Sequence, residues 1–307
     1  MEAGGAEVHW VEGGTGQPTV FLHGLADCHL SFAPLAGAFR GRRVLLLDLP
    51  GHGLSGRPDA VYSPEWYAGV IGAWWDQLGL EDVDLVGHSY GGALAQLMLL
   101  SHAERVGTLT LVAPGGLGSE VSFWLRLLTL PRAEQVIGPF LGLGTRLALA
   151  SVPGSSMSRD SRALAGWYAS RPGTARALVR TTRAVIDLAG QHRLVHERVH
   201  EAGALPPTAV LWGTHDRILP LRHAELARGW LQGLDVRTYD GCGHWPHLER
   251  TAHVARDIER LWSDHGRPAV RVAVERIPRP AWPVRAWRAG VRAARRVFRP
   301  RRPLLPA

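Results

Sequence analysis

The sequence of 307 residues contains only two cysteines, Cys28 and Cys242, and no lysine. Two cysteines are too few for a disulfide framework, and without a CxxC spacing they form no zinc or redox motif. We therefore expect two reduced thiols. The absence of lysine makes arginine the source of all 35 basic side chains, which reflects a compositional bias rather than a function.

Long apolar runs are also missing. No segment approaches the roughly 20 apolar residues that a membrane-spanning helix needs. The first ten residues include Glu2 and Glu7 and lack the basic start and apolar stretch of a signal peptide, so we expect a cytoplasmic protein. Hydrophobic residues make up 46% of the chain and charged residues 20%, which is typical of a globular protein with a substantial core.

The net charge of +8 is distributed unevenly along the chain. Residues 267–307 contain 12 arginines and one acidic residue, Glu275, which gives +11 and leaves −3 for residues 1–266. The pattern of segment 283–299 in this basic tail predicts an amphipathic helix whose apolar face adjoins an arginine-rich face. Its apolar residues recur at helical intervals: Val284, Trp287, Val291, Ala294 and Phe298. Such a helix suits an anionic membrane surface, a protein partner or docking on the core, and a disordered tail is the remaining alternative. Nucleic acid is disfavoured because no recognition fold accompanies the charge.

Short apolar runs that end in Gly, Pro or Asp alternate with helical patterns, which indicates an α/β fold with a mostly parallel central sheet flanked by helices. The predicted strands are 18–22, 43–47, 83–86, 109–112, 209–212 and 236–239. Residues 7–11 with the turn at 13–14 predict an opening hairpin strand. Between residues 118 and 205 only helical patterns occur, around 123–128, 163–168 and 175–188. We therefore expect a core of residues 1–117 and 206–266, with a last helix near 252–262, an inserted helical cap and the basic tail.

The motif Gly87-His-Ser-Tyr-Gly91 follows a predicted strand and precedes a predicted helix. The pattern G-x-S-x-G in this context is typical of a strained turn that exposes a nucleophilic serine, here Ser89. A serine needs a base, and the base needs an acid that holds its tautomer. Asp216 and His244 follow later strands in the required order. Their neighbours His215, His247, Asp240 and Glu249 are competitors that we interpret as loop or helix-cap residues.

A developing oxyanion needs two backbone donors that are already in place. We expect one to be the N–H of Tyr90, directly after the nucleophile. The second should come from the loop after His23 and Gly24, with Leu25 as the candidate.

Five segments in this order resemble the α/β-hydrolase superfamily, in the branch that carries a cap. They are 21–24 (FLHG), 48–55 (DLPGHGLS), 87–92 (GHSYGG), 212–216 (WGTHD) and 241–249 (GCGHWPHLE). The resemblance implies Ser89 as nucleophile, His244 as base and Asp216 as orienting acid, with no cofactor and no metal. Serine in the turn argues against the dehalogenase and epoxide-hydrolase branches, which use aspartate there.

The expected activity is hydrolysis of a small-molecule carboxylic ester or related acyl substrate through an acyl-enzyme. The resemblance leaves open a carbon–carbon bond hydrolase of diketone-like substrates, lactonases, thioesterases, cofactor-free haloperoxidases and a slow-turnover ligand receptor. Beneath the cap we expect an apolar pocket. Its candidate substrate-binding residues are Trp124, Trp167, Tyr168 and Trp245.

Two further patterns have competing interpretations. The segment from His196 to His200 matches H-E-x-x-H, which can hold zinc on one helix face, but its place at the end of the cap favours an ordinary helix. Cys28 follows the oxyanion loop and Cys242 precedes His244. Both thiols are therefore candidates for lining the site.

Overall fold

The computed structural model of the protein describes residues 1–195, 198, 205–230 and 234–266. The predicted basic helix 283–299 and both histidines of the H-E-x-x-H pattern lie outside these residues. No helix among the described residues has the length and apolar character to span a membrane.

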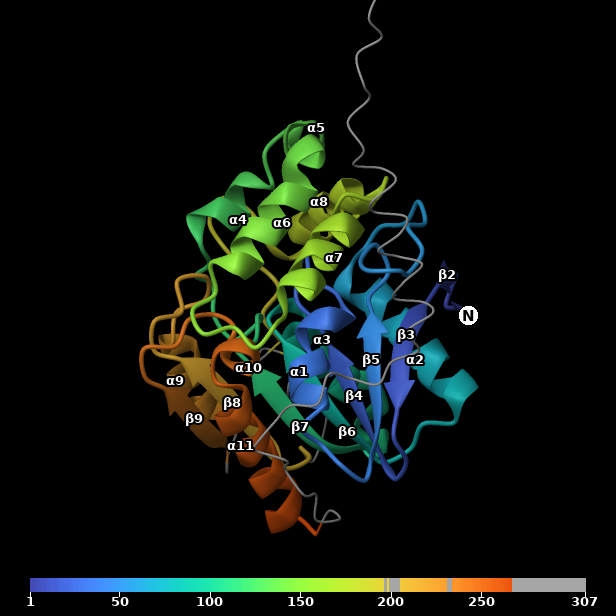
Figure 1. The fold of residues 1–307 in the computed structure, drawn as a ribbon, viewed down its shortest axis with the longest axis vertical. Helices are drawn as coiled ribbons and strands as arrows, with labels where there is room; N and C mark the ends of the chain where they lie inside the picture. Colours follow the sequence, from blue (N-terminus) through green and yellow to red (C-terminus); the bar gives the residue numbers. More distant parts are fainter. Residues whose placement is uncertain (196–197, 199–204, 231–233, 267–307) are drawn as a thin grey trace, which may run out of the picture.

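A seven-stranded sheet forms the centre of the molecule (Figure 1), in the spatial order β3-β5-β4-β6-β7-β8-β9. Every neighbouring pair is parallel except β3 and β5. The strands are β3 (His9–Gly13), β4 (Gln17–Leu22), β5 (Arg42–Asp48), β6 (Val83–His88), β7 (Val106–Val112), β8 (Thr208–Gly213) and β9 (Asp235–Tyr239). The short strands β1 (Glu2–Ala3) and β2 (Ala6–Glu7) pair only with each other. The prediction of a mostly parallel sheet is confirmed.

The predicted opening hairpin is wrong in its pairing. Strand β3 does not pair with β4, the next strand along the chain, but lies antiparallel to β5 with His9 opposite Asp48. The connection between β3 and β4 passes the start of β5, where a Cβ on Gly14 would lie 2.2 Å from the carbonyl oxygen of Arg42. Gly14 has a φ of +76°, so only a residue without a side chain fits this close approach.

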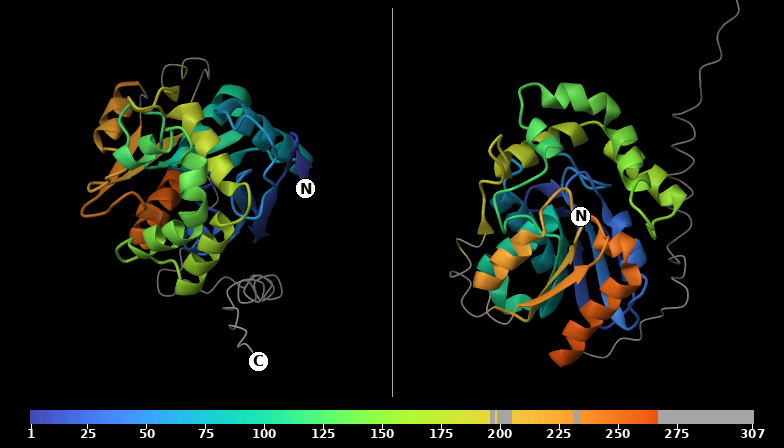
Figure 2. Two further views of the ribbon diagram at one scale, coloured as in Figure 1. Left: turned by 90° about the horizontal axis from the view of Figure 1, so that it is seen from above. Right: turned by 90° about the vertical axis from the view of Figure 1, so that its left-hand side faces the viewer.

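Helices cover both faces of the sheet (Figure 2) because the buried strands are apolar on both sides. In β5, Leu45 packs with the helices of one face and Leu46 with those of the other. The first face carries α2 (Pro64–Leu78), α3 (Tyr90–His102) and α9 (Arg222–Trp230), and the second carries α1 (Ala33–Ala36) and α11 (Thr251–Asp264). Short turns complete the core: η1 (His29–Ser31), η2 (Ala103–Arg105) and α10 (Pro246–Glu249).

Local sequence signals explain where α2 begins and ends. The hydroxyl of Ser63 accepts a hydrogen bond from the backbone N–H of Trp66, and Pro64 occupies the first helical position. The helix ends at Gly79, whose φ of +57° is the left-handed conformation that glycine adopts readily.

The elements described in the inserted segment between β7 and β8 are helices, and they lie beyond the carboxyl ends of the parallel strands (Figures 1 and 2). These helices are α4 (Phe123–Leu127), α5 (Ala133–Ile137), η3 (Gly138–Phe140), α6 (Leu141–Ala150), α7 (Arg159–Ala169) and α8 (Thr174–Val185). Helix α8 is shorter than predicted because Ile186 is extended and forms an isolated bridge with Gln191. The boundaries 118–205 of a separate cap stay a prediction.

Candidate active site

Ser89 lies between β6 and α3, where the backbone makes a sharp turn. Its φ of +52° is unusual for a residue with a side chain. The turn requires glycine on both sides, because a Cβ on Gly87 would lie 2.5 Å from the carbonyl oxygen of Gly91, and one on Gly91 would lie 2.1 Å from that of Leu22. The backbone N–H of Ser89 donates to the carbonyl of Val112, 3.0 Å away. The strained turn is thus held between two strands.

Asp216 and His244 are brought together from the loops after β8 and β9. Nδ1 of His244 donates to Oδ2 of Asp216 at 2.7 Å. The other carboxylate oxygen accepts from the backbone N–H groups of Ile218 and Leu219 at 2.8 and 2.9 Å. The carboxylate is therefore fixed by its own loop, and it orients the ring of His244 through Nδ1.

The loop that carries His244 is anchored from two sides. Both carboxylate oxygens of Glu249 accept from the backbone N–H of Gly243, at 3.1 and 3.0 Å. On the other side, Nε2 of His88 donates to the carbonyl of His244 at 2.9 Å. Burial, with His247 and His244 nearby, holds the pKa of His88 well below its ordinary value, so the ring is neutral. Since His88 precedes Ser89, this bond links the candidate base to the candidate nucleophile. This role of His88 is not predicted from the sequence.

The loop after β4 lies directly against the turn at Ser89. A Cβ on Gly24 would be 3.1 Å from the Cβ of Ser89. His23 organises this loop, because its Nε2 accepts from the backbone N–H of Leu49 at 3.0 Å and its Nδ1 donates to the carbonyl of Gly24 at 2.8 Å. Among the described residues, neither the backbone N–H of Leu25 nor that of Tyr90 donates a hydrogen bond. Both donors remain available for an oxyanion.

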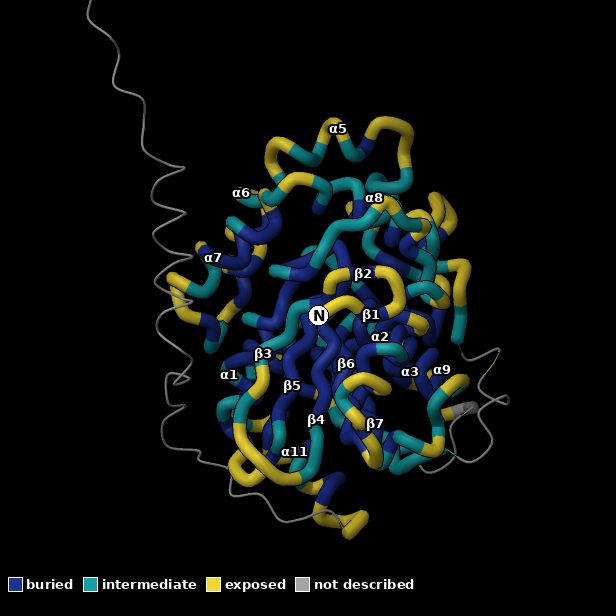
Figure 3. Tube along the Cα trace, turned by 90° about the vertical axis from the view of Figure 1, so that its right-hand side faces the viewer, coloured by how far each residue is buried: buried dark blue, intermediate teal, exposed yellow. Residues whose placement is uncertain are grey.

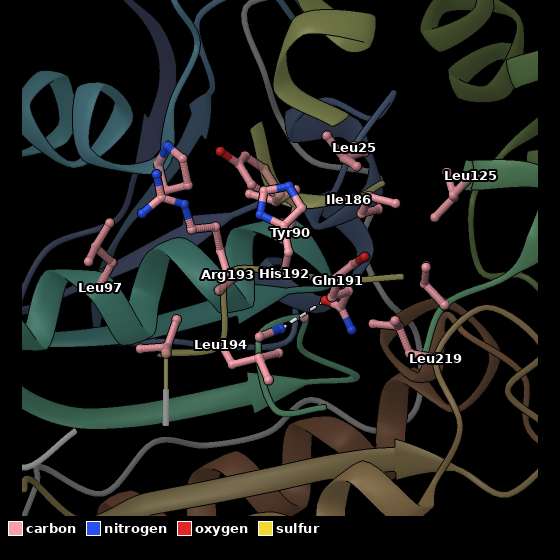
Figure 4. A pocket seen from close by; sticks show the side chains of 18 of the residues that line it. Leu25, Tyr90, Leu97, Leu125, Ile186, Gln191, His192, Arg193, Leu194 and Leu219 are labelled. Atoms are coloured by element: carbon pink, nitrogen blue, oxygen red, sulfur yellow. Dashed lines mark hydrogen bonds between the residues drawn. The ribbon is translucent and has the colours of Figure 1, made fainter. Parts of the chain in front are cut away.

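Ser89, Leu25 and Tyr90 share the wall of a cavity of about 210 Å³. Figure 4 shows this cavity, with Leu25 and Tyr90 labelled. Most of its lining is apolar and comes from both the core and the inserted segment: Leu97, Val121, Leu125, Val185, Ile186 and Leu219. Polar side chains also line the cavity: Glu65 from α2, and a group from the chain after α8 that we call the polar wall, namely Gln191, His192, Arg193 and Arg198. The cavity therefore combines a mostly apolar lining with polar side chains, and Ser89 lies on its wall.

Gln191 holds this polar wall in place. Its side-chain oxygen accepts from the backbone N–H of Gly116 at 3.0 Å, and its amide nitrogen donates to the carbonyls of Gly118 and Glu120 at 2.6 and 3.2 Å. Gln191 is not among the site residues predicted from the sequence. No local signal marks it, because the hydrogen-bond partners of its side chain all lie about 70 positions earlier in the chain.

The cavity lining includes none of the four aromatic residues predicted to bind substrate. Trp124 is 75% exposed. Trp167, Tyr168 and Trp245 belong to a separate apolar cluster in which the inserted segment packs on the core. Their part in substrate binding stays a prediction that this cavity does not support.

The other candidates from the sequence also lie outside the cavity lining. Cys28 and Cys242 are buried, and burial raises the pKa of Cys242 to about 12. Among the competitors for the acid–base roles, Asp240 accepts from the hydroxyl of Thr214, whereas His215 is exposed.

Two groups of described residues bring three potential metal-binding atoms within 4.8 Å of one another. In the first, Oδ2 of Asp48 accepts from Nδ1 of His9 and of His29 at 2.8 and 2.9 Å. Burial alone would raise the pKa of Asp48, but His29 and His9 hold it well below its ordinary value. The second group is Asp27, His88 and His247. Neither group contributes to the cavity lining.

The family model described as alpha/beta hydrolase fold matches residues 17–251. The chain belongs to this family. An uncharacterized protein of Mycobacterium tuberculosis is 30% identical over 262 residues, which cover 81% of this chain and 76% of that protein. A 2-hydroxymuconate semialdehyde hydrolase of Pseudomonas putida is 29% identical over 275 residues and covers 85% and 92% of the two chains. The structure of an esterase from Rhodococcus sp. aligns with a TM-score of 0.69 at 22% identity, over 85% of this chain and 96% of the esterase. Membership in this family confirms the predicted α/β-hydrolase fold.

Proposed function

We propose that the protein is a serine hydrolase that cleaves a carboxylic ester or a related acyl substrate. One observation carries the proposal. The Asp216–His244 pair, with its 2.7 Å hydrogen bond, is tied through His88 to the strained turn at Ser89, and this serine opens onto an apolar cavity.

In the proposed reaction, Oγ of Ser89 attacks the ester carbonyl carbon while Nε2 of His244 takes the hydroxyl proton. Asp216 stabilises the imidazolium that forms. The N–H groups of Leu25 and Tyr90 donate to the oxyanion, and loss of one such donor typically costs about 100- to 1000-fold in rate. His244 then protonates the departing alcohol. A water molecule deprotonated by His244 releases the acid from the acyl-enzyme and restores Ser89.

The cavity supports a short acyl group. Its volume of about 210 Å³ is below the roughly 300–1000 Å³ of pockets that enclose drug-sized ligands. Val121, Leu125, Val185 and Ile186 supply part of the wall from the inserted segment. We therefore propose that this segment acts as a cap over the acyl site.

The test is hydrolysis of p-nitrophenyl acetate, butyrate, octanoate and dodecanoate by the wild type and by Ser89→Ala. We expect turnover that favours the shorter esters and a loss of about 1000-fold or more in kcat for Ser89→Ala. Ser101→Ala is the matched control, because Ser101 is exposed at the end of the same helix. If Ser89→Ala hydrolysed the esters as fast as the wild type, Ser89 would not be the nucleophile.

A second candidate is hydrolysis of a carbon–carbon bond in a diketone-like substrate. The similarity to the 2-hydroxymuconate semialdehyde hydrolase favours it, since that relative is covered over 92% of its length. The same serine variants assayed on a conjugated ring-fission dienoate would separate the two activities. Faster consumption of the dienoate than of every ester would favour the second candidate. Folded protein without turnover of either substrate would refute both.

A further inference from the structure

Large apolar side chains are exposed on one part of the molecule. Eleven such side chains are exposed among the described residues, and eight of them lie within residues 118–205. Seven of them lie on α4, α5, η3, α6 and the links between these elements, and we call this set the outer apolar face. They are Phe123, Trp124, Leu130, Val136, Phe140, Leu143 and Leu147, which are 39–75% exposed. Isolated exposed apolar residues are normal, but such a concentration indicates an interaction surface.

The spacing along α5, η3 and α6 gives this face a regular pattern. Leu143 and Leu147 are four residues apart in α6, which places them on one side of that helix, and Val136 of α5 and Phe140 of η3 precede them at intervals of 4 and 3 residues. Helix α6 buries Thr145 and Leu149 on its other side. Figure 3 shows exposed residues along α5, at the end of the molecule far from the sheet. Helix α6 thus exposes Leu143 and Leu147 on one side and buries Leu149 on the other.

Charge indicates what kind of partner this face meets. Residues 118–205 contain 11 arginines and six acidic residues, a net charge of +5, whereas the rest of residues 1–266 carries −8. Arg132 and Arg146 are exposed beside the outer apolar face. Among the described residues, no ion pair includes Arg126, Arg132 or Arg146. An anionic partner is therefore complementary, and a partner with the same positive charge is not.

We propose that the outer apolar face binds the surface of an anionic lipid bilayer. Apolar side chains that include Trp and Phe, flanked by arginine, are the combination that lies in a membrane interface. A second copy of the chain would bring two segments of +5 together, and the tail 267–307 carries +11. A second copy and the tail are therefore both disfavoured as occupants of the face, because each would bring positive charge against positive charge. The tail would instead be attracted to the same anionic surface as the face.

The outer apolar face adjoins the cavity. Val121 and Leu125 line the cavity, and Phe123 and Trp124 lie between them in the chain. A bilayer in contact with α4 would place the cavity beside the lipid. This arrangement favours an apolar ester that reaches Ser89 from the membrane, and this statement about the substrate rests on the proposed function. The binding surface itself does not depend on that function.

The experiment is co-sedimentation of the full chain with vesicles of phosphatidylcholine alone or mixed with phosphatidylglycerol. The variant Phe140→Gln/Leu143→Gln/Leu147→Gln removes three apolar side chains from the face and leaves the tail intact. Val61→Gln/Leu226→Gln is the matched control, since both residues are exposed outside the inserted segment. We expect wild type and control to bind the anionic vesicles, and the triple variant to bind at least about tenfold more weakly.

Two results would overturn the proposal: no binding of the wild type to anionic vesicles, or equal binding of the triple variant. Sedimentation velocity supplies a third, because a wild-type dimer that the triple variant dissociates would assign the face to a second copy. Hydrolysis of a water-soluble ester by the same proteins keeps the two proposals separate. The triple variant should retain this activity, since none of its three residues lines the cavity.

Discussion

Buried histidines should make the protein less stable as the solution becomes mildly acidic. His247 and His52 are 0% and 1% exposed. Burial, reinforced by His244, lowers the pKa of His247 to about 3, and burial, reinforced by His23, does the same for His52. The pKa of each folded imidazole is thus below its unfolded value of about 6.5. The unfolded chain binds more protons below that pH, so stability is full above it and falls as pH decreases toward 3.

The magnitude follows from these two pKa values. Between about pH 7 and about pH 5, each unfolded imidazole becomes almost fully protonated while its folded counterpart stays neutral. Each group therefore removes about 2 kcal/mol from the free energy of unfolding over this interval. For His52 and His247 together the loss is about 4 kcal/mol, which is a large share of the stability of an ordinary domain.

The assay is urea unfolding of the wild type and of His247→Leu at both pH values. Neither ring nitrogen of His247 has a hydrogen-bond partner among the described residues. The ring packs 4.6 Å from that of Phe32, so leucine replaces packing without breaking a hydrogen bond. Comparing the pH-induced loss within each protein cancels any constant change in packing. The variant should lose about 2 kcal/mol less than the wild type.

His215→Leu is the matched control, because His215 is exposed. Its loss between the two pH values should equal that of the wild type. If His247→Leu lost as much stability as the wild type, a neutral buried imidazole at position 247 would be refuted.

Three further predictions concern single contacts. Gly24→Ala should lower kcat on nitrophenyl esters about tenfold or more with little change in stability, because the Cβ of the new alanine would lie 3.1 Å from the Cβ of Ser89. An unchanged kcat would contradict this close approach. Asp84→Ala should lower the free energy of unfolding by about 3–5 kcal/mol in urea titrations, because it leaves the fully buried Arg42 without the carboxylate of their ion pair; a loss below about 1 kcal/mol would contradict this account. Glu249→Gln, which keeps an acceptor for the N–H of Gly243, should retain more esterase activity than Glu249→Ala, and equal activities would argue against an anchoring role.

The sheet could be predicted from sequence because its central strands are buried on both faces. The runs 18–22 and 209–212 lie within β4 and β8, each short, apolar and bounded by turn residues. The pairing of β3 could not be predicted in this way. Strand β3 pairs with β5, about 35 positions later in the chain, and no pattern in residues 7–14 indicates this partner.

The candidate site could likewise be predicted only in part from the sequence. Ser89, Asp216 and His244 each follow a strand within a recognisable motif, and the ends of parallel strands meet at one edge of the sheet. The cavity walls depend instead on how the inserted helices dock. Trp124 faces solvent although its type suits a pocket, and Gln191 reaches the cavity through bonds to Gly116 and Gly118. Side-chain direction on a short helix is decided by such distant contacts.

The most direct test of the central claim is covalent labelling of Ser89. The wild type is incubated with diisopropyl fluorophosphate, and the adduct is measured by intact-mass and peptide mass spectrometry. We expect a single adduct on Ser89 that is absent from Ser89→Ala and forms much more slowly in Asp216→Asn. Folded wild-type protein without an adduct, or with its adduct on another residue, would contradict the assignment of Ser89 as the nucleophile.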